Sequence, residues 1–239
     1  MKKLEYWLWQ DKDETASTID DAANFASAEK ADKLVFSAKV QTAGRGKPGR
    51  NWKSGAGNLM FSMLFEYDFS NVGMLSLLCG LMVLKTVAYF SPKLETKLKW
   101  PNDVFVCGKK ICGILIEKKD ERHIIVGIGI NLKSAPSIDN ALYQAASLAE
   151  FGISVGREEF LHQFLRLFNL GLAKLRKKEF NEIKNEWLQY AENINKEISV
   201  KIGNTEQIGI MTGVDENGAL LLMTANGTKK VAAGDVYER

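Results

Sequence analysis

The glycine-rich segment at residues 41–58 constrains the fold most strongly. It contains GRGKPG at 44–49, which matches the G-x-G-x-x-G spacing of a dinucleotide-binding loop. In a doubly wound fold such a loop opens a helix, whose N-terminus binds the pyrophosphate. Here Pro48 interrupts the motif, and the next apolar run, LMFSMLF at 59–65, is typical of a strand. The sequence therefore argues against a Rossmann loop and predicts a long basic loop between two strands.

The other apolar patterns predict an α+β fold with a mixed β-sheet. Short alternating runs bounded by turn residues predict strands, and longer apolar periods predict helices. The predicted strands are 4–9, 33–40, 59–65, 98–100, 104–106, 111–118 and 124–131, and the predicted helices are 22–29, 73–90, 140–151, 157–177 and 179–190. Strands and helices alternate only in part, and a hairpin is expected around Gly108. This order favours a mixed sheet with helices packed on it.

The composition changes after residue 190. Four short strands are predicted at 197–202, 207–214, 219–224 and 229–232. They are separated by Gly203-Asn204, Asn217-Gly218 and Asn226-Gly227, which are turn-forming dipeptides. This pattern predicts a small β-barrel. We therefore divide the chain into a larger domain at 1–193 and a C-terminal domain at 194–239.

Charge and cysteine content limit the function classes. The formal net charge is +3, which is too small for bulk nucleic-acid binding, so any basic site must be local. Cys79, Cys107 and Cys112 lack C-x-x-C spacing and indicate reduced thiols in a cytoplasmic protein. Glu5 interrupts the N-terminal apolar run, and the uncharged run at 70–84 is shorter than the roughly 20 residues of a membrane span. We expect no signal peptide and no membrane partner.

The loop at 41–58 has the chemistry of an anion-binding site. Five cations and no acid lie between positions 39 and 53, namely Lys39, Arg45, Lys47, Arg50 and Lys53. The glycines allow backbone N–H groups to turn toward an anion, and the arginines supply forked donors. The loop has little apolar material, so we expect it to be mobile until an anionic ligand orders it. Taken alone, its composition also fits a solvated basic loop.

Four further segments, read together with this loop, indicate one family. They are ASTI at 16–19, KWPND at 99–103, KICGILIE at 110–117 and GIGIN at 127–131. In this order and spacing the chain resembles biotin protein ligases over nearly its whole length. The resemblance implies a mixed-sheet catalytic domain and an SH3-like C-terminal barrel. It also implies the monofunctional type, because the predicted catalytic strand begins near Leu4 and leaves no room for an N-terminal DNA-binding domain.

The resemblance implies an ATP-dependent ligation in two steps. The carboxylate of biotin attacks the α-phosphate of MgATP, which forms biotinyl-5′-AMP and releases pyrophosphate. A specific lysine of a biotin carboxyl carrier domain, part of a biotin-dependent carboxylase, then attacks the adenylate. Biotin and ATP are thus the expected substrates, Mg²⁺ the expected cofactor, and the carrier domain the expected partner. The Mg²⁺ ligands are not predicted.

The resemblance assigns three groups of site residues, each by its place in a motif. The catalytic residues are Lys110, Arg45 and Asp103. The biotin-binding residues are Ser17, Thr18, Gln41, Gly44, Arg45, Gly46, Lys47, Lys110 and Gly113. The residues that bind ATP or the adenylate are Arg45, Lys47, Arg50, Trp52, Lys99, Asn102 and Asn131.

Several of these residues have alternative roles. Both reactants of the first step are anions, and a fixed ammonium at Lys110 removes their repulsion. Asp103 can hold Mg²⁺ through its oxygens or accept a proton from the incoming lysine, and our hypothesis is proton acceptance. Ser17 and Thr18 can cap a helix as well as bind a ligand. Trp52 is either a cover for the nucleotide or a core aromatic residue.

Two positions depart from the family pattern. Lys47 stands where the family usually has arginine, so the charge is kept but the forked donor is lost. We therefore expect weaker retention of the adenylate. Ile19 stands where the family has asparagine, so we assign it no hydrogen bond to the ligand.

Other functions compete with this assignment. A lipoate ligase is the nearest enzymatic alternative, and AGRGKPGR at 43–50 argues against it because lipoate ligases lack this motif. A nucleic-acid-binding module and a protein-binding scaffold are the other two alternatives.

The segment GISVG at 152–156 matches a nucleophile elbow, but helical patterns on both sides indicate that Gly152 ends a helix. The strand at 123–131 is expected to present an edge, for a homodimer or for the carrier domain.

Overall fold

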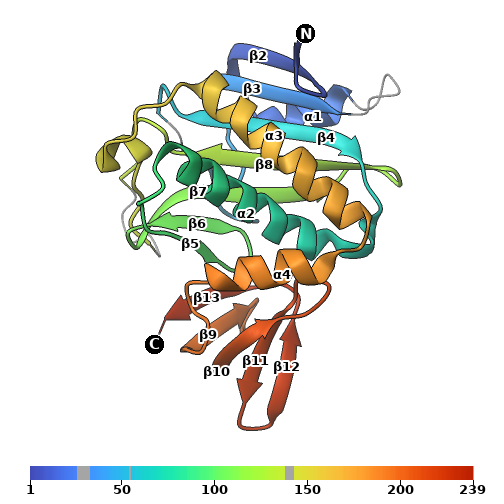
Figure 1. Ribbon diagram of the computed structural model, residues 1–239, viewed down its shortest axis with the longest axis vertical. Helices are drawn as coiled ribbons and strands as arrows, with labels where there is room; N and C mark the ends of the chain where they lie inside the picture. The colour runs from blue at the N-terminus through green and yellow to red at the C-terminus, as the bar shows by residue number, and fades with distance from the viewer. Residues whose placement is uncertain (26–32, 54, 138–142, 239) are drawn as a thin grey trace.

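The larger sheet is mixed, as the sequence predicts. The structure is a computed structural model and describes residues 1–25, 33–53, 55–137 and 143–238 (Figure 1). The strand order is β1-β2-β3-β4-β8-β7-β6-β5. These strands are β1 (Lys2–Leu4), β2 (Trp7–Thr15), β3 (Leu34–Gln41), β4 (Leu59–Glu66), β5 (Thr96–Lys99), β6 (Asp103–Val106), β7 (Lys109–Lys118) and β8 (His123–Ile130). β2 and β3 run parallel, and the other neighbours are antiparallel.

Helices cover the two faces of this sheet differently. α2 (Val72–Phe90) and α3 (Arg157–Arg176) lie together on one face, and α4 (Phe180–Gln189) lies between α2 and the C-terminal strands (Figure 1). α1 (Thr18–Phe25) contacts β3, β4 and β8 instead. Along β4, Phe61, Met63 and Phe65 belong to the core under α2 and α3, whereas Leu64 belongs to a smaller cluster with α1. Because successive side chains of a strand point to opposite faces, α1 covers the opposite face.

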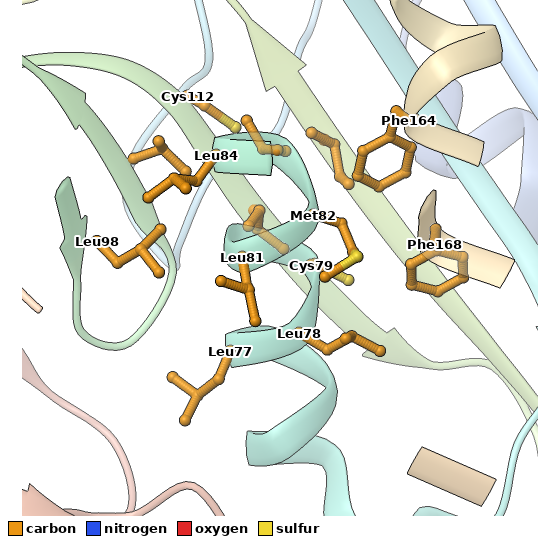
Figure 2. Packing of buried hydrophobic residues seen from close by; sticks show 14 of the residues in the cluster. Leu77, Leu78, Cys79, Leu81, Met82, Leu84, Leu98, Cys112, Phe164 and Phe168 are labelled. Atoms are coloured by element: carbon orange, nitrogen blue, oxygen red, sulfur yellow. The ribbon is translucent and has the colours of Figure 1, made fainter. Parts of the chain in front are cut away.

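Helix α2 forms the centre of the larger core. Its Leu78 and Met82 lie toward Phe164 and Phe168 of α3 (Figure 2). Gly171 allows the two helices to approach closely, because a Cβ at this position would lie 2.5 Å from Leu78 Cδ1. By length and composition alone α2 is apolar enough to cross a membrane, but 67% of its most apolar stretch is buried inside the protein. This burial is the property of the core helix predicted at 73–90.

The C-terminal strands form a second, antiparallel sheet in the order β12-β11-β10-β9-β13. They are β9 (Glu197–Ile202), β10 (Thr205–Val214), β11 (Leu220–Thr224), β12 (Gly227–Val231) and β13 (Asp235–Glu238). The four predicted strands are confirmed, and β13 is an addition that the sequence pattern does not predict. The pairings of the described residues do not join β12 to β13, so closure into an SH3-like barrel stays a prediction.

The turn at 215–218 attaches this second sheet to the larger one. Trp100 Nε1 donates a hydrogen bond of 2.9 Å to the carbonyl oxygen of Gly218. Gly218 also lies against the start of α2, since a Cβ at Gly218 would be 2.5 Å from the carbonyl carbon of Gly73. The C-terminal strands are therefore held next to the KWPND segment.

The helix predicted at 140–151 is wrong within the described part of that range. Residues 143–147 are not helical, and a 3-10 helix, η2 (Leu148–Phe151), follows them. The segment pairs with β7 instead: Lys110 N donates to Gln144 O, and Ala146 N donates to Lys110 O, both at 2.9 Å. This tertiary pairing overrides the local helical pattern, and residues 138–142 lie outside the described part. Gly152 ends η2 with a φ of 79°, as predicted.

Two further predictions are wrong. Glu5, with a φ of 54°, separates β1 from β2, where the sequence predicts one strand. By contrast, the helix predicted through 22–29, with its N-cap at Thr15, Ser17 or Thr18, is confirmed as α1, which begins at Thr18; residues 26–32 lie outside the described part. β8 pairs with β4 on one side and β7 on the other, so its edges are occupied. The predicted edge at 123–131 is therefore not free for a homodimer or a carrier domain.

Two leucines of α3 test the placement of the larger core. Leu172 is 3% exposed and Leu170 is 64% exposed. We expect Leu172→Ala to lower the free energy of unfolding by about 2–5 kcal/mol, because it removes a packed side chain and leaves a cavity. Leu170→Ala should change it by less than about 0.5 kcal/mol. Urea denaturation followed by circular dichroism measures both, and equal losses would contradict this orientation of α3.

Candidate active site

A cavity of about 720 Å³ lies on the sheet face that carries α1. Its floor consists of directly paired residues of β7 and β8, with Gly113 opposite Gly129 and Leu115 opposite Gly127. The start of α1 forms one wall. The segment at 44–52, which we call the strap, forms another, and Tyr237 of β13 contributes from the C-terminal sheet. Both sheets therefore contribute residues to this cavity.

Most of the predicted site residues line the cavity. They are Ser17, Thr18, Gln41, Arg45, Gly46, Lys47, Arg50, Trp52, Asn102, Asp103, Lys110, Gly113 and Asn131. Gly44 and Lys99 are not among the lining residues. The fold thus brings together segments that are far apart in the sequence.

The strap is a small hairpin of its own. Arg45 and Asn51 form an isolated antiparallel bridge, and Gly46 N donates to Arg50 O at 3.0 Å. Trp52 N donates to Gly44 O at 2.9 Å, and a Cβ on Gly44 would lie 2.5 Å from Trp52 O. Gly44 therefore allows the hairpin to close, which explains its place outside the cavity.

Carboxylates from three other elements contact the strap cations. Arg45 Nη1 lies 2.9 Å from Asp20 Oδ1 of α1, and its Nη2 contacts Glu117 of β7. Lys47 and Arg50 both contact Asp235, the first residue of β13. These ion pairs hold the strap in the described structure, and its mobility in the absence of a ligand stays a prediction.

Asp235 is held ionised by this arrangement. Burial raises its pKa, but the charges of Lys47 and Arg50 and their hydrogen bonds outweigh burial, so its pKa lies below the ordinary value. A carboxylate with a lowered pKa keeps its negative charge at neutral pH.

Trp52 lies directly on the floor of the cavity. A Cβ on Gly129 would lie 2.3 Å from Trp52 Cε2, and a Cβ on Gly113 would lie 2.9 Å from Trp52 Cζ3. These two glycines therefore leave room for the indole ring. Trp52 Nε1 is buried and has no hydrogen-bond partner among the described residues. The ring is therefore an apolar part of the cavity wall, and its role as a cover for the nucleotide stays a prediction.

The start of α1 presents polar groups to the cavity. Thr18 donates to Gln41 Oε1 from its backbone N at 2.8 Å and from its hydroxyl at 3.1 Å. These hydrogen bonds fix the orientation of the Gln41 carboxamide, with its oxygen toward Thr18, so its NH₂ group is the end that can donate to a ligand. Ser17 Oγ accepts from Ile19 N at 3.3 Å, so Ser17 caps α1 and lines the cavity at once. Both predicted roles of Ser17, capping the helix and binding a ligand, fit the structure.

Lys110 and Asp103 form an ion pair at the cavity wall. Lys110 Nζ lies 2.7 Å from Asp103 Oδ1 and 6.0 Å from the centroid of the Trp52 ring. The two residues come from the neighbouring strands β7 and β6. The backbone of Lys110 is also bonded to residues 144 and 146, so the position of this lysine is fixed on both sides.

Two asparagines of the cavity, buried Asn131 and half-buried Asn102, have buried acceptor atoms without a partner among the described residues. Asn131 donates from Nδ2 to Ala146 O at 3.1 Å, and Asn102 donates from Nδ2 to Ile114 O at 2.5 Å. Neither Oδ1 atom has a hydrogen-bond partner. A buried acceptor that lacks a partner is costly, so both oxygens favour a ligand that donates hydrogen bonds.

Lys99 lies behind an aromatic residue of the cavity. Its side chain is 3% exposed, with Nζ 3.8 Å from the centroid of Tyr143 and 4.0 Å from Glu238 Oε1. Burial lowers the pKa of Lys99, and Glu238 partly opposes this effect. Tyr143 lines the cavity and donates to Val236 O. Lys99 therefore contacts Tyr143, a lining residue, and does not line the cavity itself, so its direct contact with ATP stays a prediction.

Some lining residues escape prediction. Gly127 and Gly129 lie in the GIGIN segment, where their period of two is a usable signal for one open strand face. Tyr237 lines the cavity from β13, a strand that the sequence pattern does not predict, and Asp235 of the same strand contacts the strap without lining the cavity. Among the described residues, no group of three or more His, Cys, Asp or Glu side chains is placed to hold a metal ion.

Two family models match the chain. The Biotin/lipoate A/B protein ligase family matches residues 12–131, and the Biotin protein ligase C terminal domain matches residues 194–239.

Curated relatives and a solved structure agree with these matches. The biotin–[acetyl-CoA-carboxylase] ligase of Paracoccus denitrificans is 31% identical and aligns over 93% of this chain and 97% of its own. The enzyme of the same name from Mycobacterium tuberculosis is 32% identical over 95% and 89%. The structure of biotin protein ligase from Aquifex aeolicus in complex with biotin and ATP has a TM-score of 0.83, 30% identity, and 97% coverage of both chains. The chain therefore belongs to the biotin/lipoate A/B protein ligase family, and within that family to the biotin protein ligases.

Proposed function

We propose that this protein activates biotin with ATP to biotinyl-5′-AMP and transfers biotin to a lysine of a carrier domain. The observation that carries the proposal is that one cavity joins a fixed lysine, Lys110, to a cationic strap. A carboxylate and a phosphate that react in one cavity need cations at both ends of the new bond. The names of the aligned relatives and the ligands of the aligned structure support this assignment.

Lys110 and Arg45 are proposed to promote the first step. The attacking carboxylate and the α-phosphate repel each other, and a preorganised ammonium and guanidinium offset this repulsion in the transition state. Arg45 reaches the cavity from the strap, although Asp20 and Glu117 hold it in the described structure. We propose that a phosphate competes with these two carboxylates for the guanidinium.

The biotin end of the cavity is proposed to lie near α1. Gln41 supplies an oriented amide, Ser17 a hydroxyl, and Trp52 an apolar surface. A neutral bicycle with a ureido group requires this combination of polar contacts in an apolar pocket. Thr18 orients Gln41, and Gly46 and Lys47 of the strap complete the wall. A lipoyl group has no ureido group for the amide to bind, which favours biotin over the lipoate alternative.

The nucleotide end is proposed to lie near Asn131 and Tyr143. The free Oδ1 of Asn131 suits the amino group of adenine, and the ring of Tyr143 offers a stacking surface. Arg50 and Lys47 face the cavity from the strap for the phosphates, and Asn102 offers its free oxygen. Lys99 acts behind Tyr143, because its ammonium covers the ring face.

Mg²⁺ is proposed to enter with ATP. Among the described lining residues, Asp103 is the only carboxylate, and it is already paired with Lys110. The residues therefore fit an ion held mainly by phosphate oxygens and water, as is common for Mg²⁺. When bound, the ion would neutralise phosphate charge.

Asp103 is proposed to act in the second step. The attacking lysine must lose a proton before its nitrogen forms the amide bond and AMP leaves. Asp103 lies 2.7 Å from Lys110, at the carboxylate end of the cavity, where a proton acceptor is needed.

The domain boundary, the partners and the cellular location of the protein are also proposals. The match of the C-terminal family model to 194–239 supports a boundary at 193. The small formal net charge of +3 supports the absence of a DNA partner. We propose a cytoplasmic location and a carrier domain as partner. Any homodimer would use a surface other than the edge of β8.

The reaction is tested by exchange of pyrophosphate into ATP. We expect exchange that depends on biotin and is absent with lipoate or octanoate. Radiolabelled pyrophosphate measures the rate for each acid at equal concentrations. Exchange that depends on lipoate but not on biotin would favour the lipoate ligase.

Lys110→Met tests the first step. Methionine keeps the length of the side chain but removes the ammonium, so we expect adenylate formation to fall by about 10²–10³-fold. Single-turnover formation of biotinyl-5′-AMP measures the effect. Lys118→Met, at the exposed end of the same strand, is the matched control and should retain the wild-type rate. A normal rate in Lys110→Met would exclude the proposed role.

Asp103→Asn tests the second step. The substitution keeps the shape but not the basicity, so transfer from preformed adenylate to the acceptor lysine should slow by roughly 100-fold. The acceptor is a biotin carboxyl carrier domain, and transfer is followed by mass spectrometry. Glu121→Gln, on an exposed turn, serves as control. If Asp103→Asn transfers biotin normally, another group accepts the proton.

A further inference from the structure

The carboxylate of Asp235 binds two cations of the strap at once. Its Oδ2 lies 2.6 Å from Arg50 Nη2, and its Oδ1 lies 3.4 Å from Arg50 Nη1. Oδ1 also lies 3.1 Å from Lys47 Nζ, which lies in addition 3.2 Å from the carbonyl oxygen of Gly234. Both carboxylate oxygens are thus in use, and they connect the C-terminal sheet to the strap.

The position of Asp235 is fixed by its strand. β13 pairs with β9, and Asp235 stands opposite Lys201. The following residues of β13 also face the site, since Val236 O accepts from the hydroxyl of Tyr143 and Tyr237 lines the cavity. Asp235 is therefore a rigid anchor, and the strap hairpin is the part that adapts to it.

The charges leave room for an anionic ligand. Lys47 and Arg50 bring two positive charges to one carboxylate, so one positive charge remains. Both cations also line the cavity. A single carboxylate thus holds the strap over the cavity without cancelling its attraction for a phosphate.

We propose that Asp235 is a positioning residue that keeps the strap closed over the adenylate by acting through Lys47 and Arg50. This inference rests on the proposed function of the strap as a phosphate-binding element. Asp235 does not contact the reacting atoms in this scheme. Its effect is on how long the intermediate stays enclosed, and not on the bonds that form or break.

Retention of the adenylate and proteolysis of the strap test this proposal. We expect Asp235→Asn to release biotinyl-5′-AMP roughly five- to tenfold faster, because two partly exposed ion pairs are lost. Trypsin should cleave the Arg50–Asn51 bond several-fold faster in the protein without ligands. The Lys47–Pro48 bond resists trypsin, so cleavage within the strap is limited to the Arg45–Gly46 and Arg50–Asn51 bonds, and mass spectrometry of the fragments distinguishes the two. Transfer from bound adenylate should keep its wild-type rate constant.

Controls separate the proposed latch, which is the contact of Asp235 with Lys47 and Arg50, from a general structural role of Asp235. Asp235→Glu should restore slow release and slow cleavage, and Glu216→Gln, which removes an exposed carboxylate elsewhere on the C-terminal sheet, should behave as wild type. Wild-type release and cleavage in Asp235→Asn would overturn the proposal, as would a defect that Asp235→Glu does not restore. The proteolysis measurement needs no catalysis, so a failure of the proposed function is distinguishable from a failure of the latch.

Discussion

Ion pairs between different elements hold this site together. Arg45, Lys47, Arg50 and Lys110 face the cavity, and each contacts a carboxylate from another element. Unpaired cations gathered around one cavity would repel each other. Carboxylates from α1, β6, β7 and β13 offset this repulsion and fix each cation in place. The pairs of Arg45 and Lys110 are partly exposed and individually weak, so a phosphate or a biotin carboxylate can compete for these two donors.

The sheet separates stability from chemistry. One face is covered by α2 and α3 and packed with apolar side chains, whereas the opposite face carries α1 and the cavity. At Gly113 and Gly129 the floor of the cavity is bare backbone, because a side chain at either position would displace Trp52. A well-packed sheet thus carries, on its opposite face, a surface where glycines leave room for Trp52 and for a ligand. The strap and β13 close this surface from outside the sheet.

Local patterns were sufficient where they agreed with the packing. The short apolar runs of β3, β4 and β8, the apolar helix α2 and the turn dipeptides of the C-terminal sheet were all readable from the sequence. The motif at 127–131 pointed to the floor strand. Prediction failed at 143–147, where backbone bonds to Lys110 replaced a helical pattern, and at 123–131, where neighbours on both sides occupied the edge. In both places a partner distant in the sequence decided the outcome.

The sequence by itself determined the chemistry of this protein. Five cations interleaved with glycines cannot form a packed core and indicate an anion-binding loop, and the resemblance carried by the motifs around Lys110 and Asp103 implies that two anionic reactants meet there. Only the tertiary structure decided which partners hold those cations. Asp235 lies far along the chain from Lys47 and Arg50, and Tyr143 shields Lys99 from the cavity. Residue type fixes which bonds a side chain can form, whereas the fold fixes which groups come within reach.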